Sequence, residues 1–225
     1  MGLDLYHGSQ NRIEKPQYGK GNRFNDYGRA FYTTENVDLA MEWAVEKDRS
    51  GYVNHYQIDT EDLSILDLSS NEYTFLHWLA ILIENRSFDV ISDFGNEAKK
   101  YILDNYLVDY ESYDIIKGYR ADDSYFSFAQ DFLSNVISIS TLSSAMRLGT
   151  LGEQIAIKSQ HAFDKLSFIE SIEADSNIWY PSKEHRDTIA RKNYKELRSK
   201  PWKRGEIYIM TIIDEEIKPD DVRLR

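Results

Sequence analysis

The stretch GRAFYTTEN, residues 28–36, and the earlier segment LDLYHGS, residues 3–9, decide how the chain is expected to fold. The earlier segment alternates apolar with polar or amphipathic residues and stops at a glycine, which predicts a short strand that runs into a loop. The aromatic and β-branched residues of the later stretch predict a second strand. Thr34 or Asn36 can then cap a helix that carries Trp43 on one side.

The rest of the chain changes between strand-like and helix-like periodicity. The helix after residues 28–36 is expected to end at Ser50-Gly51. No repeat or linker divides the sequence, so we expect one domain over residues 1–225. Strands scattered among helices, without regular βαβ alternation, favour the α+β class. Further strands are predicted at residues 52–58, 62–68, 113–119, 155–157 and 206–213, and helices at 75–83, 98–107, 126–137 and 185–198.

The composition limits the chemistry. The chain has 225 residues, of which 41% are hydrophobic, and this is enough to bury a core. It has no cysteine, which excludes disulfides and cysteine nucleophiles, and its five histidines show no metal-ligand spacing, so we expect no metal site. No run of about 18 apolar residues and no secretory signal occurs, which favours a cytoplasmic location without a membrane partner.

The net charge of −11 hides a basic segment, residues 183–204. This segment holds nine Lys or Arg against three Asp or Glu. The overall charge argues against sequence-independent binding to duplex DNA, which depends on neutralising phosphates. The basic segment is therefore either a solvated helical face or a site for phosphate, nucleic acid or an acidic partner.

The N-terminal residues together resemble the NAD-binding half of the diphtheria-toxin-like ADP-ribosyltransferases. The likeness rests on the segment YHGS at residues 6–9, on residues 28–36, and on Trp43, which follows Tyr32 by eleven residues. Most of the chain, including YDIIKGYRADD and GEQIAIKS, is similar to a group of bacterial proteins of unassigned function placed with this superfamily. The resemblance implies an ADP-ribosyltransferase-like α+β fold of two packed mixed or antiparallel sheets with surrounding helices.

The resemblance also implies that NAD binds as a co-substrate. The nicotinamide ring is a flat cation that two aromatic faces hold well, and Tyr32 and Trp43 can supply those faces, although Trp43 can equally be a core residue. Gly8 lacks a Cβ and lets the main chain approach the carboxamide, while His7 is placed to bond the adenosine ribose. Arg23 and Arg29 are candidates for the pyrophosphate. The full set of expected NAD-binding residues is His7, Gly8, Ser9, Arg29, Tyr32, Thr33 and Trp43.

The sequence departs from the family pattern at its third element. Enzymes of this class place a glutamate at the start of a late strand, where it bonds the nicotinamide ribose and stabilises the cationic transition state. We align Gln154 with that position because the apolar strand follows it directly, and keep Glu153 as the alternative. Neighbouring strand residues point to opposite faces, so the two cannot both face NAD unless a bulge intervenes. A glutamine brings no charge, and losing such a charge typically costs about 10²- to 10³-fold in rate. Asp122 or Asp123 can supply a carboxylate instead. The candidate catalytic residues are Gln154, Glu153, Tyr32 and His7.

Three functions remain open. The leading one is an NAD-dependent ADP-ribosyltransferase that passes ADP-ribose to a macromolecular acceptor, protein or nucleic acid, and releases nicotinamide. By resemblance alone, such a bacterial enzyme is expected to be a toxin restrained by an antitoxin protein. The first alternative is a catalytically weak module that binds NAD or ADP-ribose. The second is an interaction domain built around the basic segment.

Overall fold

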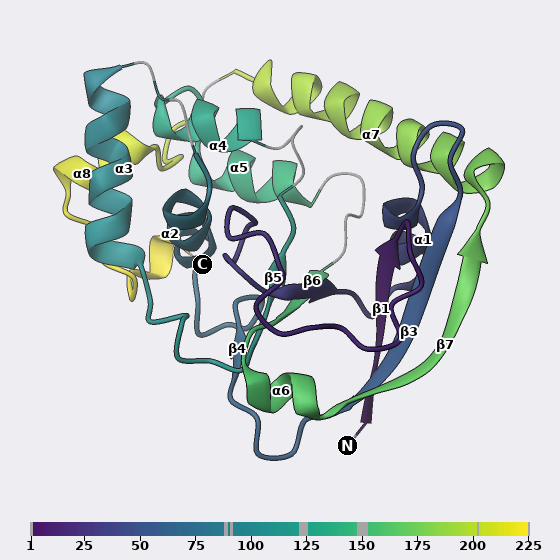
Figure 1. Cartoon of the computed structure of the whole chain (residues 1–225). Helices are drawn as coiled ribbons and strands as arrows, with labels where there is room; N and C mark the ends of the chain where they lie inside the picture. Colours follow the sequence, from purple (N-terminus) through teal and green to yellow (C-terminus); the bar gives the residue numbers. More distant parts are fainter. Residues whose placement is uncertain are drawn as a thin grey trace.

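The computed structural model describes residues 2–87, 90, 92–121, 126–147, 153–201 and 203–224, and its strands form two sheets (Figure 1). The first sheet is antiparallel throughout and has the order β1 (Gly2–Ser9), β3 (Gly51–Asp59), β7 (Leu166–Ala174). The second has the order β2 (Phe31–Thr33), β6 (Glu153–Ile157), β5 (Ile115–Tyr119), β4 (Ile65–Asp67), with β4 and β5 parallel. These sheets and the helices around them confirm the predicted α+β class with mixed and antiparallel sheets.

Helices surround both sheets. The four-stranded sheet is accompanied by α2 (Phe75–Asn85), α3 (Asp93–Tyr106), α4 (Phe126–Leu133), α5 (Ile139–Met146), α6 (Gln160–Asp164), α8 (Ile209–Asp214) and a short 3-10 turn at Val222–Leu224. The other two helices are α1 (Val37–Ala44) and α7 (Ser176–Arg198). α7 contacts α5, which lies with the helices of the four-stranded sheet, and α1, which packs on the three-stranded sheet, so it spans both groups (Figure 1). Within the described part of the chain, no helix combines the length and apolar character needed to cross a membrane.

Among the described residues, a backbone bridge between Tyr6 and Thr34 joins the two sheets. Tyr6 and Thr34 exchange both backbone hydrogen bonds, at 2.8 and 3.0 Å, and join the edge of β1 to the end of β2. Beyond this bridge, β1 and β2 belong to different sheets and separate. Apolar side chains from β1, β3, β5 and β6 fill the space between the sheets, namely Leu5, Ile58, Ile115, Ile155 and Ile157.

α1 begins where the sequence predicts but ends earlier. The Asn36 side chain caps it by accepting from the backbone N–H groups of Asp38 and Leu39. The predicted end at Ser50-Gly51 is wrong, because the helix stops at Ala44. A tight turn follows, in which Glu46 and Arg49 exchange backbone hydrogen bonds at 3.0 and 3.1 Å. This turn reverses the chain so that it enters β3 directly.

The predicted strand at residues 206–213 is wrong, because residues 209–213 belong to α8 and residues 206–208 form no strand. Ile209 and Ile212 lie three residues apart and are both fully buried, whereas Met210 between them is 45% exposed. That spacing is helical, and α8 packs against α3. The Asn135 side chain accepts a hydrogen bond from the Met210 N–H at 3.0 Å, at the first turn. Burial against the neighbouring helix therefore outweighs the β propensity of the isoleucines.

Candidate functional site

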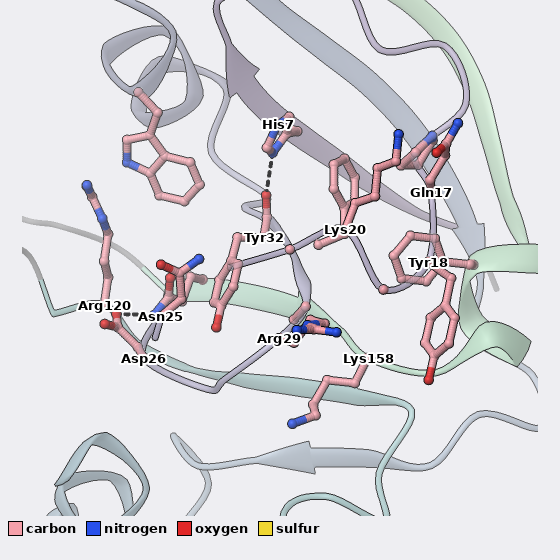
Figure 2. Close-up of a pocket in the computed structure, with 18 of the residues that line it drawn as sticks. His7, Gln17, Tyr18, Lys20, Asn25, Asp26, Arg29, Tyr32, Arg120 and Lys158 are labelled. Carbon is pink, nitrogen blue, oxygen red and sulfur yellow. Dashed lines mark hydrogen bonds between the residues drawn. The ribbon is translucent and has the colours of Figure 1, made fainter. Parts of the chain in front are cut away.

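A cavity of about 1220 Å³ opens where β1 and β2 separate. Its walls come from the loop between β1 and β2, from β6, from α1 and from the inward face of α7. In Figure 2, Asp26 and Arg120 gather at one side, Tyr18 lies at the other, and Tyr32 and Arg29 lie between them. The cavity brings together five of the predicted site residues, His7, Arg29, Tyr32, Trp43 and Gln154.

His7 bridges the two separating strands. Its Nδ1 lies 2.7 Å from the backbone carbonyl oxygen of Tyr32, and its ring packs against Phe31 with centroids 4.4 Å apart. A carbonyl only accepts, so Nδ1 carries the proton and Nε2 is left as an acceptor. Burial lowers the pKa of His7, which keeps the imidazole neutral at physiological pH. His7 therefore offers a neutral acceptor in the cavity wall.

Tyr32 is held by the loop that precedes it. Its hydroxyl donates to the carbonyl of Gly28 at 2.7 Å and accepts from the Tyr27 N–H at 3.0 Å. Gly28 has φ of +74°, and a Cβ there would lie 2.7 Å from Oδ1 of Asn85, so this turn requires glycine. The Nζ of Lys158 donates to the Tyr27 carbonyl at 3.0 Å and ties the same loop to the end of β6. The aromatic ring of Tyr32 is thus fixed before any ligand binds.

Trp43 lies in the cavity wall and is half-buried, which distinguishes it from the core residues around it. The guanidinium of Arg120 lies 4.8 Å from its ring centroid and covers one face of the indole. The indole Nε1 is buried and finds no hydrogen-bond acceptor among the described residues. A buried donor without an acceptor is uncommon and suits a ligand site. Of the two predicted roles, the position of Trp43 favours the site over the core.

Gly8 is required for a reason that the sequence did not indicate. A Cβ at Gly8 would lie 2.1 Å from the carbonyl oxygen of Ala40 and 2.7 Å from the N of Ala44, so the missing side chain lets α1 pack on β1. The peptide groups of Gly8 face another way. The backbone N–H and C=O of Tyr6 bond to Thr34 on the edge of β1 that faces away from β3. Because every second residue of an antiparallel strand directs its backbone groups to the same edge, the N–H and C=O of Gly8 also point to this edge. This edge lies where β2 has left β1.

Gly8 and Glu153 do not line the cavity, and neither do Thr33, Ser9 and Arg23. Thr33 is fully buried, and its hydroxyl donates to the carbonyl of Ile155 at 3.0 Å, so it joins β2 to β6. The Ser9 hydroxyl accepts from the Asn11 N–H at 3.2 Å at the end of β1. Arg23 packs over the ring of Phe24, 4.6 Å from its centroid. The structure therefore gives these residues structural or surface roles. Asp122 and Asp123, the other predicted carboxylates, lie outside the described residues.

Gln154, rather than Glu153, faces the cavity. Gln154 is 4% exposed, and its Nε2 donates to Oδ2 of Asp26 at 2.7 Å and to the carbonyl of Tyr119 at 3.2 Å. Both partners only accept, so the amide must point its nitrogen at them and leave Oε1 as the atom it offers to the cavity. Glu153 lies on the opposite face of β6, with its carboxylate 3.1 Å from Nζ of Lys117. The prediction that these neighbours face opposite ways is confirmed.

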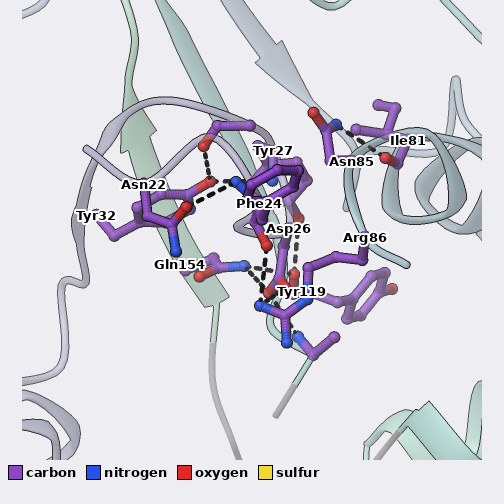
Figure 3. Close-up of polar contacts among 12 residues, drawn as sticks. Asn22, Phe24, Asp26, Tyr27, Tyr32, Ile81, Asn85, Arg86, Tyr119 and Gln154 are labelled. Carbon is purple, nitrogen blue, oxygen red and sulfur yellow. Dashed lines mark hydrogen bonds and ion pairs between the residues drawn. The ribbon is translucent and has the colours of Figure 1, made fainter. Parts of the chain in front are cut away.

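Asp26 is a buried carboxylate at the cavity wall that sequence reasoning missed. It is 5% exposed, and it accepts from the Ala121 N–H at 2.9 Å and from Gln154 (Figure 3). The Nη1 of Arg86 lies 3.8 Å from its Oδ1. Desolvation raises the pKa of Asp26, partly offset by these donors. Its partners are 95 and 128 residues away along the chain, so no local pattern could have marked it.

The cavity carries positive charge in a protein whose net charge is −11. Its acidic lining residues are Asp26, Glu111 and Asp187. Local accumulation of one charge sign in a cleft raises the concentration of ligands of the opposite sign. The cavity is therefore suited to an anion. The cationic lining residues are Lys15, Lys20, Arg29, Arg86, Arg120, Lys158, Lys183 and Arg191.

Some cationic side chains of the basic segment line the cavity, and others form ion pairs that hold α7 against neighbouring helices. Lys183 and Arg191 line the cavity. Arg186 instead places its Nε 2.8 Å from Oε2 of Glu42 on α1, with both side chains mostly buried. Near the other end, Nε of Arg198 lies 3.1 Å from Oδ2 of Asp131 on α4. α7 is therefore docked on α1 and α4 through Arg186 and Arg198, and the binding of phosphate, nucleic acid or an acidic partner by the basic segment stays a prediction.

Comparison with known proteins places the chain in one family. No curated protein and no solved structure matches it significantly. The family described as "Protein of unknown function (DUF3990)" matches residues 3–168. This range contains β1 to β6 and the residues His7, Tyr32, Trp43 and Gln154, and it ends before α7. The match covers well over half of the sequence, and the chain therefore belongs to the DUF3990 family.

Proposed function

We propose that this protein is an NAD-dependent ADP-ribosyltransferase with an ADP-ribosyltransferase-like fold. The proposal rests on one observation. A single cationic cavity is lined by His7 of β1, Tyr32 of β2, Gln154 of β6 and Trp43 of α1. The resemblance to the ADP-ribosyltransferases assigns His7, Tyr32 and Trp43 to NAD, and Gln154 stands where those enzymes have their catalytic glutamate. In the proposed reaction, nicotinamide leaves and ADP-ribose passes to a macromolecular acceptor.

The two aromatic residues suit the nicotinamide ring. A flat cation is attracted to the electron-rich faces of Tyr and Trp, most strongly where water is excluded. The hydroxyl bonds of Tyr32 fix its ring in advance, which reduces the entropy lost on binding. Arg120 already covers one face of Trp43, which shows that this ring accepts a cation. The nicotinamide would take the other face or displace the guanidinium.

The remaining parts of NAD also find partners of the right chemistry. The edge of Gly8 presents one donor and one acceptor, which is what a carboxamide requires. The acceptor Nε2 of His7 suits a ribose hydroxyl. Arg29, Lys20 and Lys183 line the cavity without an acidic partner among the described residues, and such unpaired cations suit a pyrophosphate.

The bond that breaks joins the nicotinamide nitrogen to the anomeric carbon of the ribose. The electron pair leaves with nicotinamide, which becomes neutral, and positive charge develops on the ribose until an acceptor oxygen or nitrogen attacks and loses a proton to water. A preorganised acceptor or negative charge beside the ribose stabilises this state. Gln154 offers such an acceptor through Oε1.

A binding module is the second candidate, and a specific observation favours it. The strand residue that faces the cavity is an amide, while the neighbouring carboxylate of Glu153 faces Lys117 on the other side. A site that binds NAD but lacks an effective charge at the ribose would hold the dinucleotide without cleaving it.

One experiment separates these candidates. The purified full chain is incubated with NAD, nicotinamide release is followed by chromatography, and NAD affinity is measured by calorimetry. Turnover that Tyr32→Ala abolishes supports the transferase. Binding without turnover supports the module. Tyr180→Ala is the control, because Tyr180 lies on α7 outside the cavity and its hydroxyl donates to Glu184 at 3.0 Å. If NAD neither binds nor reacts, both candidates are wrong.

A further inference from the structure

The amide of Gln154 is held in one orientation by groups that the proposed reaction does not otherwise use. Both hydrogens of Nε2 have acceptors, the Asp26 carboxylate at 2.7 Å and the Tyr119 carbonyl at 3.2 Å. Turning the amide over would place Oε1 against two other acceptors and lose both bonds. Figure 3 shows the Gln154 oxygen turned away from Asp26.

This orientation gives the cavity the same hydrogen-bonding group that a glutamate would give. A carboxylate oxygen accepts hydrogen bonds from the ribose hydroxyls, and Oε1 of Gln154 is also an acceptor. No described residue donates to Oε1, so it is available to a ligand. An unrestrained glutamine would present its nitrogen as readily as its oxygen. Asp26 and Tyr119 remove that ambiguity.

The Asp26 carboxylate also brings negative charge to the same place. Among the described residues, its oxygens accept from the Ala121 N–H and the Gln154 amide nitrogen, Arg86 lies 3.8 Å away, and the charge of Arg120 also acts on it. Burial is the larger effect and raises the pKa of Asp26, while these donors and cations oppose it and favour the ionised carboxylate. The charge is separated from Oε1 by a single amide group, in a wall where little water screens it.

We propose that Asp26 and Gln154 act as one unit, in which Asp26 fixes Oε1 of Gln154 toward the ribose and supplies the negative charge that the strand residue lacks. Gln154 touches the substrate, and Asp26 is a positioning residue that acts through it. This inference rests on the proposed function. It places the carboxylate of the site on the loop between β1 and β2 rather than on β6.

The test compares turnover with binding in two charge-altering variants. Asp26→Asn keeps an oxygen that can accept from Gln154 and Ala121 but removes the charge. We expect kcat for nicotinamide release to fall by about 10²-fold or more, with the Kd for NAD changed by less than about twofold. Asp26→Asn combined with Gln154→Glu returns a carboxylate to the strand, and we expect kcat to recover by at least about tenfold over Asp26→Asn.

A purely structural role for Asp26 would not produce that rescue. Asp164→Asn is the matched control, because Asp164 bonds to Gln160 at 2.7 Å on an exposed surface, and its kcat should equal that of the wild type. If Asp26→Asn fails to fold, Gln154→Met takes its place, since it removes Oε1 and keeps Asp26, and it should show the same loss of kcat at unchanged Kd.

Several results would overturn the inference. Wild-type kcat in Asp26→Asn or in Gln154→Met would do so, as would a double variant that binds NAD without recovering turnover. If Glu153→Gln loses turnover while Asp26→Asn keeps it, the carboxylate that acts at the ribose is Glu153 on β6 and not Asp26. A wild type that does not turn over NAD refutes the proposed function itself. An active wild type with an equally active Asp26→Asn refutes only the role of Asp26.

Discussion

Replacing Gln154 with glutamate would place a second carboxylate about 2.7 Å from Oδ2 of Asp26, where the wild type has an amide nitrogen. Two unit charges at this separation repel by roughly 6 kcal/mol at an effective dielectric constant of about 20. The folded variant avoids this cost by keeping one proton on the pair. Holding a proton at pH 7 on a carboxyl whose ordinary pKa is about 4.3 costs roughly 3.7 kcal/mol, and at pH 5 roughly 1 kcal/mol.

The variant should therefore lose stability as the pH rises. Its folded state keeps a proton that the unfolded chain releases above about pH 4.3, so the unfolding free energy falls with pH relative to the wild type. The slope is about 1.4 kcal/mol per pH unit, and the deficit should be about 1 kcal/mol at pH 5 and about 3 to 4 kcal/mol at pH 7. Urea unfolding of both proteins at the two pH values measures the difference directly.

A matched control exists on the surface. Gln160 donates to Oδ1 of Asp164 at 2.7 Å, as Gln154 does to Asp26, but both partners are exposed. Gln160→Glu should change stability by less than about 0.5 kcal/mol at either pH. The reasoning is refuted if Gln154→Glu shows the same deficit at pH 5 and pH 7, or no more than the control, because the two side chains would then not be in buried contact.

Three further predictions address the rest of the site. Gly8→Ala should destabilise the protein by about 1 to 3 kcal/mol or more, because its Cβ would meet the Ala40 carbonyl at 2.1 Å, while Ser9→Ala should change the melting temperature little. Lys183→Glu should weaken NAD binding in calorimetry, with a loss that shrinks at high salt; a loss independent of salt would contradict a direct charge effect. Trp43→Ala should weaken NAD binding by about 1 to 2 kcal/mol with little change in melting temperature. The reverse pattern would make Trp43 a packing residue of α1.

The local signals in the sequence determined the first third of the fold and much of the site. Alternation at residues 3–9 predicted β1, and Asn36 caps α1 as expected, because strand periodicity and capping depend on residues a few positions apart. The resemblance to the diphtheria-toxin-like ADP-ribosyltransferases predicted that His7, Tyr32 and Trp43 share one site, and the structure brings all three to one cavity. The opposite orientations of Glu153 and Gln154 also followed from strand geometry alone.

Only the tertiary structure decided which of these two side chains enters the cavity and which carboxylate stands beside it. The position of β6 between β2 and β5 turns Gln154 inward, and the loop that carries Asp26 closes on it from 128 residues away. The same kind of cause placed residues 209–213 in the helix α8 instead of the predicted strand, since burial against α3 outweighed local propensity. It also added β7 as a strand beside β3 that the sequence pattern did not reveal. Periodicity reports how a segment can be buried, but the surface that buries it comes from distant parts of the chain.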